Sequence, residues 1–166
     1  LHTAYRRQRQ MCIRDRDLSL EATKVTDAGL VHLKGLTNLQ SLGLQNSQVT
    51  GGGLVHLKGL TGLQDLWLSG TKITDARLAR LAGMNLKKLT IPMQARTDVG
   101  LQHYLSAVEP QSELALADWH ITDAGLVHLQ GLKKLEALYL PRRISNAALA
   151  QLRKSFPNWK ITRRRM

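Results

Sequence analysis

The chain has 166 residues and a formal net charge of +12, and 43% of its residues are hydrophobic but only 4% are aromatic. This length suits one ordinary domain, whose core must be filled by aliphatic side chains, chiefly leucine. No apolar run approaches the roughly 18 residues of a transmembrane helix, and the single cysteine, Cys12, excludes an internal disulfide and a cysteine zinc cluster.

Residues 1–16 are polar, basic and without hydrophobic periodicity, as in a disordered tail. They resemble translated sequencing-adapter read-through, so we expect an artefactual leader that takes no part in the fold. The alternative is a genuine N-terminal arm. If the leader is artefactual, earlier repeats are missing, and the strand around Leu18 leaves an open apolar edge at which copies could pair.

From residue 17 onward the chain consists of repeats of about 24 residues. The motif T-D-A-G-L-V-H-L at residues 26–33 recurs at residues 122–129, and the variant T-G-G-G-L-V-H-L lies at residues 50–57. Weaker copies follow Thr74, Thr97 and Ser145. Successive anchor leucines are 24, 24, 23, 25 and 23 residues apart: Leu30, Leu54, Leu78, Leu101, Leu126 and Leu149.

Each repeat also holds a pair of leucine or isoleucine residues two positions apart, and this alternation predicts a short strand with one buried face. The Thr or Ser that opens each motif suits a helix N-cap. The aspartate that follows it, such as Asp27, suits the positive end of a helix dipole. Leu30, Leu33 and Leu36 mark one helix face, and Gly35 suits the helix end. The paired residues are Leu18/Leu20, Leu42/Leu44, Leu66/Leu68, Leu89/Ile91, Leu114/Leu116 and Leu138/Leu140.

The pattern Leu39-x-x-Leu42-x-Leu44-x-x-Ser47-x-Val49 resembles the leucine-rich-repeat consensus. The 24-residue unit with T-D-A-G-L resembles bacterial repeats of the ribonuclease-inhibitor-like superfamily, over residues 17–161. The resemblance implies an α/β fold, a right-handed leucine-rich-repeat solenoid in a horseshoe arc, with a parallel β-sheet on the concave face and helices on the convex face. It implies about six repeats and a C-terminal half-repeat cap before a basic tail at residues 162–166.

The fourth and fifth repeats depart from the pattern. Pro92 follows the strand, Arg96 takes the place of the branched aliphatic residue of other repeats, and the loop at residues 109–112 lacks the usual leucines. We expect looser packing between these two repeats. Drift under weak constraint and an insertion shaped by a partner are the two explanations.

The middle residue of each strand pair should point to the concave face, because side chains alternate along a strand. Trp67 and Tyr139 stand out there, since exposed aromatic residues are typical binding anchors, although a scattered exposed aromatic is also ordinary. Three repeats at a spacing of ~4.8 Å place them about 14 Å apart. The predicted partner-binding residues are Ser41, Gln45, Asp65, Trp67, Lys88, Glu113 and Tyr139.

No catalytic or metal-binding set emerges from the sequence. Four histidines, His32, His56, His103 and His128, share one helix position. Helices in adjacent repeats lie ~8–10 Å apart, so these side chains cannot converge to the ~2.1 Å that zinc requires. The run at residues 51–53 lacks the phosphate-binding pattern. We therefore expect no enzyme activity, cofactor or metal.

The sequence predicts a protein–protein interaction module whose concave face binds a protein partner of unknown identity, with no small-molecule substrate. We expect a monomer unless the N-terminal edge self-associates. The alternative is a structural or spacer segment of a larger multidomain protein. Nucleic acid binding ranks third, because residues 1–16 and 160–166 each carry a net charge of +4 and leave only +4 for the body.

Overall fold

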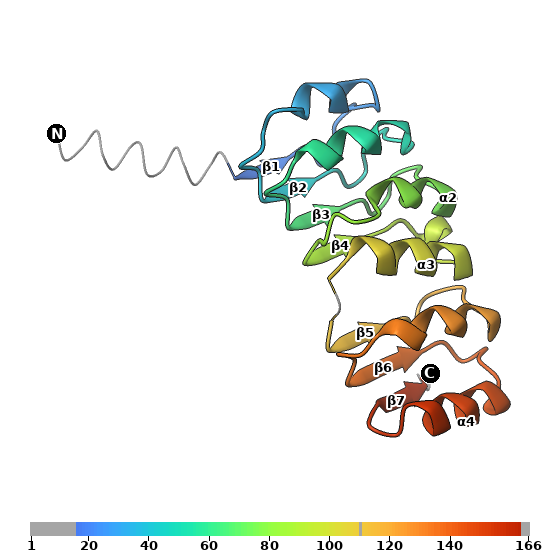
Figure 1. Cartoon of the computed structure of the whole chain (residues 1–166). Coiled ribbons are helices and arrows are strands. Elements are labelled where there is room, and N and C mark those ends of the chain that lie inside the picture. Colours follow the sequence, from blue (N-terminus) through green and yellow to red (C-terminus); the bar gives the residue numbers. More distant parts are fainter. Residues whose placement is uncertain (1–15, 110, 164–166) are drawn as a thin grey trace.

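The computed structural model describes residues 16–109 and 111–163, so the predicted leader, apart from Arg16, lies outside the described residues. The fold is an α/β solenoid in which short parallel strands alternate with helices, and the strands and helices line opposite sides of the stack (Figure 1). Its strands are β1 (Asp17–Ser19), β2 (Ser41–Gly43), β3 (Asp65–Trp67), β4 (Lys88–Thr90), β5 (Glu113–Ala115), β6 (Ala137–Leu140) and β7 (Lys160–Arg163).

The helical segments are short, and several have 3₁₀ geometry. The 3₁₀ segments are η1 (Gly29–Leu33), η2 (Gly52–Gly59), η3 (Ala79–Leu81), η4 (Met93–Ala95) and η5 (Ala124–Gly131). The α-helices are α2 (Asp75–Leu78), α3 (Asp98–Ala107) and α4 (Asn146–Ser155).

Two α-helices, α3 and α4, run for ten residues. They belong to the two repeats in which the usual stop glycine is replaced, by Ser106 and by Lys154. They are also the ones that begin with the predicted side-chain cap: Thr97 Oγ1 accepts from the Gly100 N–H at 3.0 Å, and Ser145 Oγ accepts from the Ala148 N–H at 3.1 Å. Thr74, before α2, makes no such cap. The N-cap prediction is therefore right for the long helices and wrong for α2.

The strands form two parallel sheets, with the orders β1-β2-β3-β4 and β5-β6-β7. The predicted parallel pairing of short strands is confirmed, but the ladder is interrupted at the junction of the fourth and fifth repeats, where β4 and β5 do not pair. Two isolated bridges, Leu86 with Val108 and Thr97 with His120, replace the ladder there. The expected loosening between these repeats is confirmed for the strands.

The sequence around residue 110 accounts for the missing ladder. Equivalent positions in other repeats would pair Lys88 with Glu113, as Asp65 pairs with Lys88. The regular register would pair Leu86 with Gln111, but Leu86 pairs with Val108, three residues earlier in the chain. The Leu86 N–H donates to Ala107 O at 2.9 Å, and the Glu109 N–H donates to Leu86 O at 2.8 Å. The next residue, Pro110, has no backbone N–H with which to continue a ladder.

The core is a column of aliphatic side chains that runs through both parts of the stack. The anchor leucines Leu30, Leu54 and Leu78 and the strand residues Leu44 and Leu68 are fully buried. Because each repeat exposes its leucines until a neighbour covers them, stacking is what closes this core.

The C-terminal strand β7 pairs with β6 from Lys160 to Arg163. Thr162 and Arg163 therefore belong to a strand, and their assignment to the basic tail is wrong. Arg163 Nη1 also donates to Ile144 O at 3.0 Å, which ties the strand to the preceding repeat. Among the described residues no helix has the length and apolar character to cross a bilayer.

Candidate functional site on the sheet face

Two rows of side chains cross the first sheet on the face opposite the buried leucines. In the first row Ser41, Asp65 and Lys88 are partners in register. In the second row Trp67 lies between Gly43 and Thr90. Adjacent strands are separated by roughly 4.8 Å, so the acidic Asp65 and the basic Lys88 are direct neighbours. Five of the seven predicted residues thus lie on or next to this sheet: Ser41, Gln45, Asp65, Trp67 and Lys88.

Trp67 is half-buried and has small neighbours on both strands beside it. Gly43 has no side chain, and the Thr90 hydroxyl is occupied, since its oxygen accepts from the Leu68 N–H at 3.3 Å and from Ser69 Oγ at 3.1 Å. The indole is therefore the largest group of its row and is available for contact.

Gln45, which follows β2, lies over Gly43. A Cβ built on Gly43 would come within 2.9 Å of Gln45 Oε1. This oxygen is buried and accepts no hydrogen bond from the described residues. A buried acceptor without a donor costs about 1–3 kcal/mol of stability.

The remaining predicted residues, Glu113 and Tyr139, lie on the second sheet. Glu113 is exposed opposite Ala137, and Tyr139 is half-buried between Ala115 and Thr162. The separation of about 14 Å from Trp67 assumed an unbroken ladder of strands. That assumption is wrong, because β4 and β5 are not paired.

Aspartates of the T-D-A-G motif link consecutive repeats, a role that the sequence analysis missed. Asp98 accepts from the Thr122 N–H at 2.8 Å and from Thr122 Oγ1 at 2.6 Å. Asp75 accepts from Thr97 Oγ1 at 2.8 Å. Four of the six copies contain both the aspartate and the hydroxyl residue, so spacing alone could not tell contacts within a repeat from contacts between repeats.

Asp27 makes the same kind of link to the second repeat, accepting from the Thr50 N–H at 3.2 Å and the Gly51 N–H at 3.1 Å. Partial burial acts to raise the pKa of Asp27, but the hydrogen bonds from Thr50, Gly53 and Gly51 outweigh it and lower that pKa below 3.8. A hydrogen bond from Ser145 likewise lowers the pKa of Asp123. These carboxylates are held ionised, which does not suit a proton-transfer role near neutral pH.

The second and third repeats depart from the motif together. Gly51 stands where most copies have aspartate, and Arg77 stands where most have glycine. A Cβ on Gly51 would lie 2.9 Å from Cβ of Arg77, so Arg77 packs against a site that only glycine leaves free. In the regular copies the glycine is needed instead: a Cβ on Gly53 would lie 2.6 Å from Asp27 O.

Trp119 is the most informative residue that the sequence analysis left unassigned. Its equivalents Thr23, Ser47 and Thr71 donate a hydroxyl hydrogen bond of 2.7 Å to the carbonyl three residues earlier. Trp119 replaces this small group with an indole that is only 7% exposed. The loss of a hydroxyl at a regularly polar position was the signal available in the sequence.

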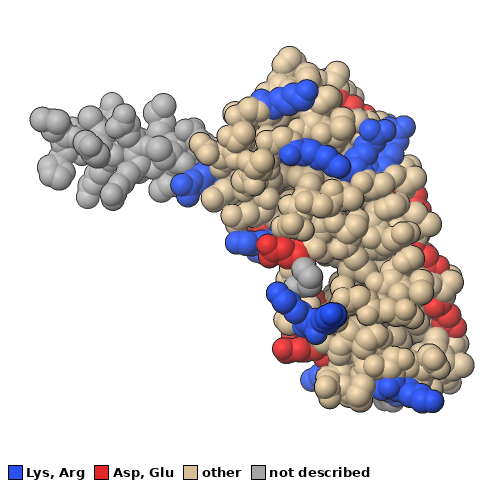
Figure 2. Space-filling view, viewed as in Figure 1, with Lys and Arg blue, Asp and Glu red and all other residues tan. Residues whose placement is uncertain are grey.

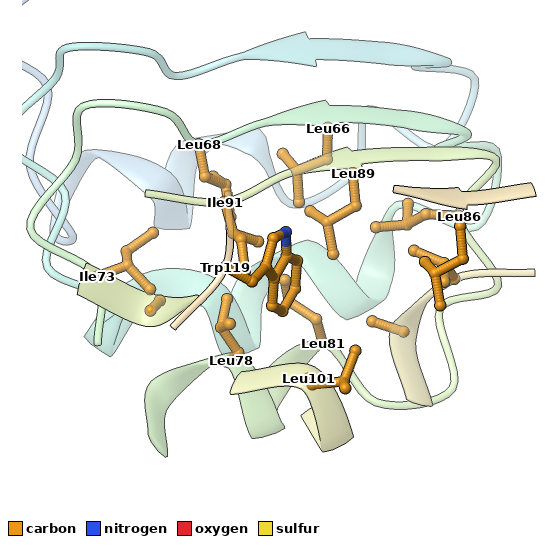
Figure 3. Packing of buried hydrophobic residues seen from close by; sticks show 14 of the residues in the cluster. Leu66, Leu68, Ile73, Leu78, Leu81, Leu86, Leu89, Ile91, Leu101 and Trp119 are labelled. Atoms are coloured by element: carbon orange, nitrogen blue, oxygen red, sulfur yellow. The ribbon is translucent and has the colours of Figure 1, made fainter. Parts of the chain in front are cut away.

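Trp119 fills the space behind the gap between β4 and β5. Figure 3 places its indole among leucine and isoleucine side chains of the third and fourth repeats. Tyr104 of α3 meets it edge-on, with ring centroids 5.3 Å apart and an interplanar angle of 79°. Burial raises the pKa of Tyr104. The other members of this buried cluster that Figure 3 labels are Leu66, Leu68, Ile73, Leu78, Leu81, Leu86, Leu89, Ile91 and Leu101.

The described part of the chain contains no group of three or more histidine, cysteine, aspartate or glutamate residues placed to hold a metal ion. His32, His56, His103 and His128 lie on separate repeats, each in a helical segment of its own.

No protein-family model and no curated protein matches the sequence. The structure is similar to a crystal structure of internalin C2 from Listeria monocytogenes, with 20% sequence identity and a TM-score of 0.36, over 90% of this chain and 80% of that chain. A similarity at this level carries no argument about architecture or partner. The chain itself has one short parallel strand in each repeat, which is consistent with leucine-rich repeats.

Proposed function

We propose that this chain is a protein-interaction module that binds a protein partner through its sheet face, with Trp67 as the central contact. The main support for this proposal is that the Trp67 indole is half-buried between the small residues Gly43 and Thr90. Large aromatic side chains near the centre of an interface contribute most to affinity. The neighbouring charges of Asp65 and Lys88 would set orientation more than affinity.

The second sheet would supply a further contact area around Tyr139 and Glu113. A partner that touches both areas must span the junction of β4 and β5, so it would be a folded protein or a long segment rather than a small molecule. We do not extend the proposal to catalysis, because Asp75 and Asp98 are engaged in hydrogen bonds between repeats.

Affinity capture with the immobilised full chain tests this function. The lysate would come from cells that carry the gene, and captured species would be identified by mass spectrometry. Trp67→Ala should remove at least one specific species and weaken its capture more than tenfold, whereas Val55→Ala, on an exposed helix position (46% exposed), should retain it. Circular dichroism would establish that each variant is folded. Capture that survives Trp67→Ala and Tyr139→Ala together would reject the sheet face as the binding surface.

A structural or spacer role within a longer array is the second candidate. Leu36 is 44% exposed in the first repeat, whereas its equivalent Leu60 is 2% exposed in the second. This apolar surface favours a further repeat stacked on the β1 side, within a bacterial T-D-A-G-L repeat array that continues the domain at residues 17–161. Sequencing the gene together with its flanking regions tests this proposal, and it tests the nature of residues 1–16 as well.

Nucleic acid binding has weaker support. On the face drawn in Figure 2, lysine and arginine side chains are scattered among neutral ones instead of forming a continuous basic face. A salt titration with the chain trimmed of residues 1–16 tests it, because phosphate contacts make log affinity fall steeply with log salt concentration.

A further inference from the structure

The junction between the fourth and fifth repeats is held by side-chain hydrogen bonds on the helix side of the solenoid, and by two isolated bridges in place of a strand ladder on the sheet side. On the helix side Asp98 bonds both the N–H and the hydroxyl of Thr122, at 2.8 and 2.6 Å. A Cβ on Gly125 would overlap the Asp98 carboxylate, so the two repeats approach closely there. On the sheet side no backbone hydrogen bond among the described residues joins β4 to β5.

The equivalent backbone amides make the contrast measurable. The N–H of Leu44 donates to Trp67 O at 2.9 Å, that of Leu68 to Thr90 O at 2.9 Å, and that of Leu116 to Tyr139 O at 2.8 Å. Ile91 is the corresponding residue of the fourth repeat, and within the described ranges its N–H has no such partner. Figure 2 shows a small opening at this level of the molecule.

Besides the two isolated backbone bridges, two side-chain contacts close the junction on this side. Trp119 packs behind it, as described above. Arg96 forms a salt bridge with Asp118 at the surface, where the two side chains are 22% and 56% exposed. Exposed ion pairs contribute little stability, typically about 0–1 kcal/mol, so the indole and its apolar contacts are the main closure on this side.

We propose that this junction is a hinge: the contact of α3 with η5 is the pivot, and Trp119 is the latch on the sheet side. Opening would swing the Trp67 sheet relative to the Tyr139 sheet and change the curvature of the face between them. Trp119 and Tyr104 are in edge-on contact at this junction, so opening would expose both rings together with the leucines that the neighbouring repeat covers. Such partial opening is cheaper than global unfolding because only one junction separates. The hinge does not depend on the identity of any partner.

Fluorescence of the full chain tests the hinge directly. In a Trp67→Phe/Trp159→Phe background Trp119 is the sole tryptophan. Acrylamide should quench it at least threefold more strongly than a rigid side chain of 7% exposure allows. To hold β4 against β5, Lys88→Cys and Glu113→Cys are introduced in a Cys12→Ser background and cross-linked with a short bismaleimide. Joining this pair should suppress the quenching, whereas joining Ser41→Cys/Asp65→Cys across the intact ladder should leave it unchanged.

Hydrogen exchange of the unmodified chain gives a second readout that needs no cross-link. The bridging amides of Glu109 and His120 should exchange at least 100-fold faster than the ladder amides of Leu44 and Leu116, while the α3 amide of Leu101 stays protected. Equal protection of bridging and ladder amides, or quenching that is unaffected by the lock, would overturn the hinge. Neither result bears on whether Trp67 binds a partner.

Discussion

The junction between β2 and β3 and the junction between β4 and β5 join repeats of similar length by different means. At the first, the strands pair residue by residue, and the position equivalent to Trp119 is the small polar Thr71. At the second, the leucine at the start of the strand segment is replaced by Gln111, and a tryptophan occupies the polar position. The comparison indicates that leucine spacing is sufficient to stack the helices and core, whereas sheet continuity depends on a few residues in the loops.

The largest expected effect compares core leucines in the two regions. Leu68→Ala, in the intact region, should lower the free energy of unfolding by about 4 kcal/mol, within the range for buried leucines. Leu114→Ala, beside the break, should cost only about 2 kcal/mol, because loosely held surroundings collapse more readily into a cavity. Urea denaturation measures both. Equal losses would remove the energetic distinction between the two regions.

The compensating pair in the regular region gives the next largest effect. Gly51→Asp should destabilise by about 2 kcal/mol, because the new side chain meets Arg77 and packed sites tolerate added atoms poorly. Gly51→Asp/Arg77→Gly should recover only the part of this loss that the contact with Arg77 causes, because the φ of +101° at Gly51 disfavours aspartate whatever its neighbours. A double-mutant cycle from thermal or urea unfolding gives the coupling energy, and additive effects would contradict the proposed compensation.

Filling the break should have a smaller, stabilising effect. An apolar pocket beside Gln111 is lined by residues that include Tyr104, Leu114 and Leu135. Gln111→Leu restores the leucine of other repeats and should raise the free energy of unfolding by about 1 kcal/mol. Gln102→Leu, on an exposed position of α3, is the matched control and should have little effect. No gain from Gln111→Leu would mean that the loop, rather than the missing leucine, keeps the strands apart.

The smallest effect concerns the pH dependence of the links between repeats. Hydrogen bonds keep the pKa of Asp27 below 3.8 in the folded chain. A lowered folded pKa stabilises the fold above the unfolded pKa, and this contribution is lost as the pH falls through the folded value. Asp27→Asn should therefore flatten the decline in melting temperature below about pH 4. An unchanged slope in scanning calorimetry would show that this link contributes nothing to acid sensitivity.

The strands and the core were predictable because their signals are local. The leucine pairs alternate with period two, and the anchor leucines recur in every repeat, so Leu44 or Leu54 could be placed without knowledge of any other repeat. The break was only partly predictable. The drift at Pro92, Arg96 and the loop pointed to the correct junction, but loss of pairing depends on which residue lies across from which. The three-residue slip of Val108 onto Leu86 cannot be deduced from spacing.

The candidate site follows the same division. Alternation along the strands predicted that Trp67 and Tyr139 lie between inward-facing leucines, and both are half-buried on such positions. Their placement on separate sheets was not predictable, because it follows from the break. The role of Asp98 was hidden by the regularity of the motif, since the aspartate acceptor and the hydroxyl donor occur together in most copies.

The Gly51–Arg77 pair also limits how the gene can change its number of repeats. Recombination between nearly identical coding segments adds or deletes a unit, and a unit is accepted most readily where both the aspartate and the glycine are present, as in the first, fourth and fifth repeats. If a repeat with aspartate at the position of Gly51 were inserted directly before the repeat of Arg77, its carboxylate would clash with the aliphatic part of the Arg77 side chain. The array could therefore lengthen or shorten elsewhere, while these two units are inherited together.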